Sequence, residues 1–291
     1  MHEKTKGRVL ILIAAVLWSS NGFFAKAPLF AEWPIEIDGI PVRGPLLAFW
    51  RALFAALVLV PFVRRPRWRK PMVPMVLAYV AMNYTFLNAL TFSSEANAIW
   101  LQNTAPMWVF LVGVLVMREP VHRRDGWLLG CSVLGIGLIL WFEVQGQSLA
   151  GVVYGLGGGI TYAGVVLSLR YLRGEDGAWL VMLNNLVAAL VFLPLVLYRD
   201  IWPDAYQLIY LAAFGAFQMG IPYLLFARGV RYVAGHEASG IVLLEPILVP
   251  VWVYLAWRHA PTYEFPAWWT LVGGALILAG LLVRYGFLRF R

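Results

Sequence analysis

Charged residues are scarce in this sequence: Asp, Glu, Lys and Arg make up 13% of the 291 residues, whereas 61% are hydrophobic. The mean hydropathy is +0.73. A water-soluble domain of this size cannot bury so many apolar side chains, so the composition predicts a protein of the lipid bilayer. The apolar runs are continuous and do not alternate with period two, which argues against an outer-membrane β-barrel.

Cysteine and histidine are also rare, and this limits the kinds of catalytic and metal-binding site that the chain can form. The single cysteine, Cys131, excludes an intrachain disulfide. The four histidines lie near the ends of apolar runs, and the sequence contains no His-Glu-x-x-His, no Gly-x-Ser-x-Gly and no phosphate-binding Gly-Lys-Ser/Thr loop. These absences argue against an intramembrane enzyme and against ATP-driven transport. We therefore predict no catalytic residue, no metal site and no cofactor.

Ten apolar runs are long enough to cross a bilayer as helices, since a helix needs roughly 20 apolar residues for this. They cover residues 8–28, 45–63, 73–92, 95–117, 126–142, 150–170, 178–198, 206–227, 237–257 and 266–286. The first run resembles a signal peptide in its basic start and in the sequence "AKA" at 25–27, but Pro28 follows directly. We interpret it as an uncleaved membrane helix. The sequence thus predicts an all-α polytopic membrane protein.

The basic residues predict the orientation of these helices. With the N-terminus in the cytoplasm, 18 of the 23 Lys and Arg residues fall on the cytoplasmic side, including the cluster at 64–70. Such an excess is typical of cytoplasmic loops. We therefore expect both termini in the cytoplasm of a multi-pass protein of the cytoplasmic (inner) membrane. Because the basic residues lie in short loops between hydrophobic runs and not in a patch with interleaved aromatic residues, the net charge of +8 does not indicate a nucleic-acid partner.

The two halves of the chain resemble each other. "GRVLILIAAVLWSSNGFFAK" aligns with "GVVYGLGGGITYAGVVLSLR", which pairs Trp18 with Tyr162, and "NAIWLQNTAPMW" aligns with "EASGIVLLEPIL", which pairs Pro106 with Pro246. Each half holds five spans, an odd number, so the second half must be inverted relative to the first. We predict two inverted five-helix repeats, residues 8–142 and 150–286, the arrangement typical of secondary transporters.

These segments resemble the EamA-type branch of the drug/metabolite transporter (DMT) superfamily over nearly the whole chain. The resemblance is carried by "AAVLWSSNGFFAK", by "LLAFWRALFAALVLVP", by "SSEANAIWLQNTAPMWVFLVGVLVMREP" with Glu119 after the span, and by the Glu-Pro pair in "GIVLLEPILVPVW". Two features depart from it: Arg258 and His259 occupy the place of a second Glu119, and the first outer loop is long. The resemblance implies ten helices around a central cavity and a small-metabolite substrate, without identifying that substrate.

Polar residues near the middle of the predicted spans are the candidates for a substrate cavity, because polar side chains are costly in lipid. Interhelical hydrogen bonding that needs no substrate is the alternative for each of them. We predict that Pro106 and Pro246 act as hinges. The substrate-binding candidates are Trp18, Asn21, Arg51, Asn83, Tyr84, Trp100, Gln102, Asn103, Tyr162, Gln218 and Glu245.

Glu245 is the sharpest of these candidates because it is the one charged residue in the run from Gly240 to Trp257. A buried carboxylate without a partner tends to take up a proton, so Glu245 is our candidate for proton coupling. Pro246 should leave carbonyls near Val242 unpaired and break the helix there. Glu245 and Arg51 would together suit a zwitterionic solute.

Three further patterns have structural interpretations. Lys26 and Glu95 lie at predicted helix ends, where their charges suit the helix dipole. Gly151, Gly155 and Gly159 recur every four residues, a spacing that favours close helix contact. Tryptophans at span edges indicate an interfacial belt: Trp33, Trp127, Trp202, Trp268 and Trp269.

The sequence therefore predicts a secondary active or facilitative transporter that exports amino-acid-like or amphipathic organic solutes by alternating access. Its partners are the lipid bilayer and a small-molecule substrate, with protons as the candidate coupling ion, and the sequence leaves the oligomeric state open. A membrane-embedded receptor or channel, and an intramembrane enzyme that uses no ATP, are the alternatives.

Overall fold

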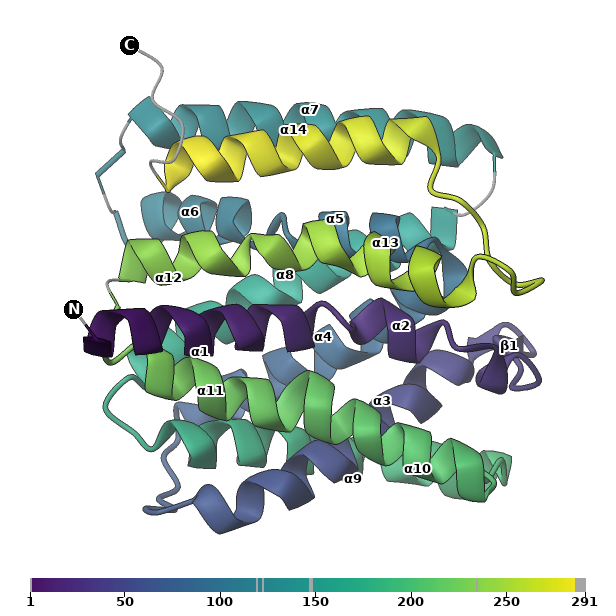
Figure 1. Cartoon of the computed structure of the whole chain (residues 1–291). Helices are drawn as coiled ribbons and strands as arrows, with labels where there is room; N and C mark the ends of the chain where they lie inside the picture. Colours follow the sequence, from purple (N-terminus) through teal and green to yellow (C-terminus); the bar gives the residue numbers. More distant parts are fainter. Residues whose placement is uncertain (1, 119, 122, 147–148, 234, 286–291) are drawn as a thin grey trace.

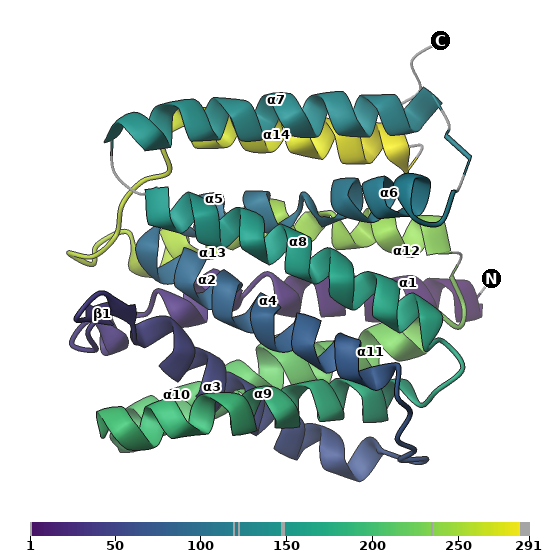
Figure 2. The same cartoon turned by 180° about the vertical axis from the view of Figure 1, so that it is seen from behind.

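The computed structural model describes residues 2–118, 120–121, 123–146, 149–233 and 235–285, and the described chain is a bundle of helices (Figures 1 and 2). Glu119 lies outside the described residues. Within these ranges, nine helical segments are long and apolar enough to cross a membrane, and a tenth apolar helix has 17 residues. The predicted all-α polytopic fold with ten spans is confirmed.

Six of the ten spans are single helices or nearly so. They are α3 (Arg43–Leu59, continued by η2, Val60–Phe62), α4 (Met72–Phe92), α7 (Arg123–Gly146), α8 (Leu149–Tyr171), α9 (Gly177–Arg199) and α14 (Trp268–Arg284). The other four spans, the first, fourth, eighth and ninth, are interrupted. They comprise α1 (His2–Trp18) with α2 (Asn21–Ala25), α5 (Glu95–Gln102) with α6 (Ala105–Leu115), α10 (Ala205–Ala213) with η3 (Phe214–Gly220) and α11 (Ile221–Gly229), and α12 (Gly235–Val242) with α13 (Leu244–Trp257).

Proline causes two of these interruptions at equivalent places in the repeats. Pro106 and Pro246 have no N–H group to donate to the carbonyl four residues earlier. Those carbonyls belong to Gln102 and Val242, and these are the last residues of α5 and α12. The expected break at Val242 is therefore present in the ninth span, and the fourth span has an equivalent break at Gln102.

The helix contacts repeat when the two halves of the chain are exchanged. α4 packs against α8, so the third span meets the sixth, and α1 packs against α11, so the first meets the eighth. α3 with α9, α5 with α13 and α7 with α14 pair each remaining span with its own counterpart. α1 begins at the end of the bundle where α8 finishes, so equivalent helices run in opposite directions (Figures 1 and 2). This is the inverted repeat that the sequence predicts.

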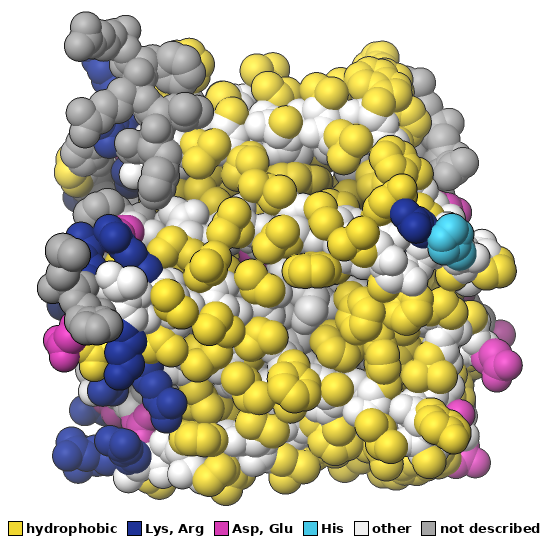
Figure 3. All heavy atoms as spheres, in the orientation of Figure 1, with side chains coloured by type: hydrophobic (Ala, Val, Ile, Leu, Met, Phe, Trp, Pro, Cys, Tyr) yellow, Lys and Arg dark blue, Asp and Glu magenta, His cyan; other side chains and the backbone are white. Residues whose placement is uncertain are grey.

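The surface has one basic end and an apolar middle. Lys and Arg side chains gather at the end where α1 begins, and hydrophobic side chains cover the face between the two ends (Figure 3). Exposed apolar residues such as Leu134 (65%) and Trp141 (67%) belong to this lipid-facing cover. At least half of the residue surface is exposed in Trp127, Trp202 and Trp268 (50%, 52% and 56%), as expected of an interfacial belt.

The long first outer loop is folded, and this overturns one interpretation. A two-residue turn at Asp38 and Gly39, both with positive φ (53° and 72°), joins strands β1 (Glu36–Ile37) and β2 (Ile40–Pro41). An Asp-Gly pair favours this hairpin turn. Trp33 packs behind it on Phe30 and is only 4% exposed. The assignment of Trp33 to the interfacial belt is therefore wrong, because the loop folds back over the helix ends and covers it.

Two glycines of the predicted stripe bring α8 against α5. A Cβ atom at Gly155 would lie 2.8 Å from the Leu101 side chain, and one at Gly159 would lie 2.5 Å from Thr104 Oγ1 and 2.8 Å from the Leu101 carbonyl. A side chain at either position would push the two helices apart. The close contact expected from the spacing is confirmed at these two positions.

We expect Gly159→Ala to destabilise the protein by about 1–3 kcal/mol, the usual range for overpacking a close contact. Thermal unfolding in detergent, followed by tryptophan fluorescence, measures the change. Gly137→Ala on α7 is the matched control, since a Cβ there meets nothing within 4 Å. An unchanged midpoint for Gly159→Ala would contradict the close packing.

Asp176 ties the basic loop after η2 to the start of α9. Its carboxylate accepts hydrogen bonds from the N–H groups of Arg64 (2.7 Å), Arg65 (3.0 Å) and Ala178 (3.0 Å). Burial tends to raise the pKa of this carboxyl group, but these N–H groups, with that of Trp179, outweigh it and hold the pKa below the ordinary value. The ionised form is therefore the one that the fold stabilises.

Because the folded pKa of Asp176 is lowered, its stabilisation is complete above the unfolded pKa of about 3.9 and disappears as pH falls through the folded pKa. We expect Asp176→Asn to lower the unfolding midpoint by the same amount between neutral pH and pH about 5, and by less below pH about 4. Unfolding scans of both proteins across this range test it. A difference in unfolding midpoint between the wild type and Asp176→Asn that grows as the pH falls would contradict this prediction.

Candidate functional site

A buried arginine lies where the two repeats meet. Arg51 on α3 is 1% exposed and donates to the side-chain oxygens of Asn83 on α4 and Gln218 in η3, the latter at 3.3 Å. Its guanidinium also lies over the ring of Phe214, 5.4 Å from the centroid. Gln218 Nε2 donates in turn to the Trp18 carbonyl at 3.4 Å, where α1 ends. Four candidate residues, from both repeats, are thus brought together.

The cluster extends through residues that the sequence reading missed. Asn83 Nδ2 donates to the Tyr79 carbonyl at 3.0 Å, and the Tyr79 hydroxyl donates to Asn185 Oδ1 at 2.8 Å. Asn185 on α9 is fully buried and donates to the Val181 carbonyl at 2.8 Å. The sequence does contain a signal for this part of the cluster, because two consecutive asparagines, 184 and 185, lie in the middle of an apolar span.

The charge of Arg51 is left without an acidic partner. No ion pair of Arg51 is found among the described residues, and its Nε atom has no hydrogen-bond partner. A buried cation balanced only by amide oxygens is expensive for a membrane protein to maintain. The guanidinium offers a planar set of donors that matches a carboxylate.

Glu245 lies in different surroundings. It follows the break in the ninth span as the second residue of α13, is half-buried, and has no hydrogen-bond partner among the described residues. Its carboxylate interacts electrostatically with the Tyr162 hydroxyl on α8. Arg51 and Glu245 share no contact, so the two charges do not form one zwitterion site in this conformation.

A cavity of about 670 Å³ opens beside Tyr162 in the basic half of the bundle. Tyr162, Asn103 and Pro106 line it, together with Val242 and Leu243 at the break that precedes Glu245. Asp125, Arg170 and Arg284 surround its basic end. Three further candidates thus face a second region, close to both proline breaks.

The remaining candidates are dispersed. Tyr84 packs on Tyr154 at 5.9 Å, Trp100 packs against Gly274, and Gln102 is buried. Asn21 begins α2, is 1% exposed, and neither of its amide atoms has a hydrogen-bond partner. The Trp18 ring lies against Phe226 at 5.2 Å. No hydrogen bond among the described residues joins these four residues, Tyr84, Trp100, Gln102 and Asn21, to the Arg51 cluster.

Comparison with known proteins gives matches over the whole chain. The EamA-like transporter family matches residues 5–141 and again residues 149–285. An uncharacterized transporter of Archaeoglobus fulgidus is 26% identical over 284 residues, which cover 96% of each chain. A solved crystal structure that covers 97% of each chain has a TM-score of 0.65 at 15% identity, a likeness of fold alone.

Two of the similar proteins have named substrates. The pseudopaline exporter CntI of Pseudomonas aeruginosa is 28% identical over 221 residues, 72% of this chain and 74% of that protein. The threonine/homoserine exporter RhtA of Escherichia coli is 28% identical over 195 residues, 64% of this chain and 61% of that protein. With two family matches that together span nearly the full length, and with ten helices in two repeats, the chain belongs to the EamA-like transporter family and is a multi-pass membrane protein.

Proposed function

We propose that this protein exports small solutes that carry an ammonium and a carboxylate group, by alternating access across the cytoplasmic membrane. The Arg51 cluster binds the carboxylate, and the basic end of the bundle faces the cytoplasm. The predicted substrate class and export direction agree with the name of a relative, the threonine/homoserine exporter. Membership of a transporter family also favours a carrier over an enzyme.

The observation that carries the proposal is the unpaired charge of Arg51. A purely structural arginine at this depth would be expected to have an acidic partner, because a lone cation is costly away from water. Amide oxygens from Asn83 and Gln218 hold the guanidinium without neutralising it. A substrate carboxylate would neutralise the cation, and the two amides belong to different repeats, so its binding would affect contacts between them.

The proline breaks are the proposed hinges. Interrupted helices whose free carbonyls and N–H groups line a site are common in secondary transporters. Pro106 and Pro246 interrupt the fourth and ninth spans at equivalent positions, next to the cavity that Tyr162 lines. A bend at these points would open or close that cavity without unfolding either helix.

Glu245 is the candidate for proton coupling. It is a half-buried carboxylate within a span, it adjoins one hinge, and it interacts with Tyr162 on α8 of the same repeat. Gain or loss of a proton at Glu245 would change that interaction and so bias the bend at Pro246. Membrane carboxylates in proton-driven carriers commonly have this role.

We expect purified protein in liposomes to transport radiolabelled L-threonine saturably. Arg51→Met should reduce the initial rate at low substrate concentration by about tenfold to a hundredfold, since a hydrogen bond to a charged group is worth about 1.5–3 kcal/mol. Arg51→Lys, which keeps the charge, should lose less. Glu245→Gln should retain counterflow exchange of L-threonine and lose the acceleration produced by an imposed pH gradient.

Glu36→Gln, an exposed substitution in β1, controls for general effects on insertion and yield. Absence of saturable flux, or equal flux in the wild type and Arg51→Met, would overturn the proposed role of the cluster. Unchanged gradient dependence in Glu245→Gln would overturn its coupling role alone.

Asn83→Asp gives Arg51 the acidic partner that it lacks, so we expect a higher unfolding midpoint together with loss of L-threonine flux. Each kcal/mol should raise the midpoint by about 2–4 °C for a chain of this size. Asn185→Asp is the matched control, because both substitutions lose an amide N–H bond to a carbonyl of the same helix, and Asn185 does not contact Arg51. The control should be less stable than the wild type. A lower midpoint for Asn83→Asp as well would mean that Arg51 does not need a countercharge.

A further inference from the structure

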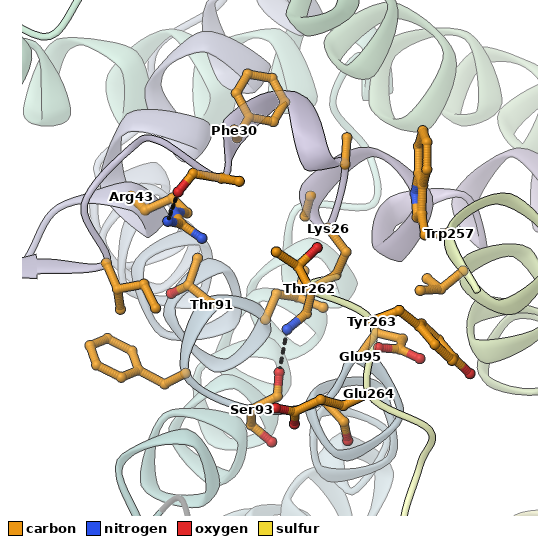
Figure 4. Close-up of a pocket in the computed structure, with 18 residues that line it drawn as sticks. Lys26, Phe30, Arg43, Thr91, Ser93, Glu95, Trp257, Thr262, Tyr263 and Glu264 are labelled. Carbon is orange, nitrogen blue, oxygen red and sulfur yellow. Dashed lines mark hydrogen bonds between the residues drawn. The ribbon is translucent and has the colours of Figure 1, made fainter. Parts of the chain in front are cut away.

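A second pocket lies at the end of the bundle opposite the basic end, outside the Arg51 cluster. It has a volume of about 370 Å³ and lies among α2, the start of α3, the junction of α4 and α5, α13 and the segment that follows it (Figure 4). Its charged lining residues are Lys26, Arg43, Glu95 and Glu264. Lys26 and Glu95 were expected only at helix ends, because residues of different spans give no sequence signal that they share one pocket.

The cationic side of the pocket has hydrogen-bond donors that have no partner among the described residues. Lys26 Nζ donates to the Ser93 carbonyl at 2.6 Å, which uses one of its three N–H groups. Arg43 donates through Nε and Nη2 to the carbonyls of Trp33 and Ala31, and its Nη1 donates to no described residue. The sticks in Figure 4 show both head groups directed towards the pocket.

The anionic side has an unused acceptor. Glu95 is 3% exposed, and its Oε1 atom has no hydrogen-bond partner. Glu95 and Glu264 both interact electrostatically with Lys26, yet neither forms an ion pair with it within 4.0 Å in the described structure. Opposite charges therefore line one pocket without forming an ion pair among the described residues, and the space between them suits a molecule of the size of an amino acid.

We propose that this pocket is a second solute site, in which Glu95 accepts hydrogen bonds from an ammonium group and Lys26 donates to a carboxylate of the same molecule. A solute with only one of these groups would satisfy one wall and leave the other unpaired, so the pocket selects solutes that carry both. Trp257 and Tyr263 provide apolar walls for the side chain of the solute. The site's place on the export path, after the Arg51 cluster, rests on the proposed function.

Protection of an introduced cysteine tests the site locally. In a Cys131→Ala background, Thr262→Cys puts a thiol on the exposed pocket rim, and a charged maleimide measures its labelling rate on purified protein in detergent. Saturating L-threonine should slow labelling by about tenfold, since an occupied pocket excludes the reagent. Equal concentrations of 3-hydroxybutyrate, which lacks the ammonium group, and of 1-amino-2-propanol, which lacks the carboxylate, should leave the rate unchanged.

Lys26→Met and Glu95→Gln should each abolish the protection by L-threonine, whereas Arg51→Met should retain it while losing flux. Tyr206→Cys, 79% exposed on α10 and outside the pocket, should label at the same rate with or without L-threonine. Saturable flux with an unprotected Thr262→Cys would overturn the second site and leave the proposed function standing. Protection that persists in both Lys26→Met and Glu95→Gln, or that either single-group analogue reproduces, would also overturn it.

Discussion

The arrangement of this bundle depends on one unneutralised charge in its interior. Arg51 is held by amide oxygens of Asn83 and Gln218 and by the face of Phe214, with no acid among the described residues to balance it. Since a lone buried cation is costly, the fold must provide a rigid, fully packed setting for it. The hydrogen bonds of Tyr79 and Asn185, which do not touch Arg51 directly, provide that setting and connect α3, α4, η3 and α9 through one polar network.

Four spans of the bundle are interrupted, and three of these interruptions have a local origin. At Pro106 and Pro246 the missing N–H group ends the preceding helix at the residue whose carbonyl it would have bonded. At the first span, Ser19 and Ser20 donate to the carbonyls of Val16 and Leu17, so α1 ends and α2 restarts without a proline. The bundle thus combines a fixed polar centre with interrupted helices, and the proposed alternating access requires these helices to bend at their breaks.

Much of the fold could be predicted from the sequence because the bilayer imposes it. Apolar length defined the ten spans, and the match between halves defined the inverted repeat. Even the break at Val242 followed from one proline. Trp33 was misassigned because hydropathy indicates only where a residue lies along a span. It does not show that a loop folds back over the helix ends and buries a residue near the span edge. The Asp38–Gly39 turn is a local signal of that hairpin, and it was read only as part of a long loop.

The candidate site was less predictable, for a related reason. Depth in the membrane follows from counting residues, but the partner of a side chain depends on how each helix is rotated and packed. Arg51, Asn83 and Gln218 meet, whereas Glu245 shares no contact with them and interacts with Tyr162. Lys26 and Glu95 belong to different spans, so no periodicity could show that they line one pocket.

The most direct test of the role of Arg51 is a structure of the protein determined with L-threonine bound. We predict density for a carboxylate within hydrogen-bond distance of the Arg51 guanidinium, with Asn83 or Gln218 displaced from it. An occupied protein in which Arg51 still donates to both amides, and in which no carboxylate reaches it, would contradict the account.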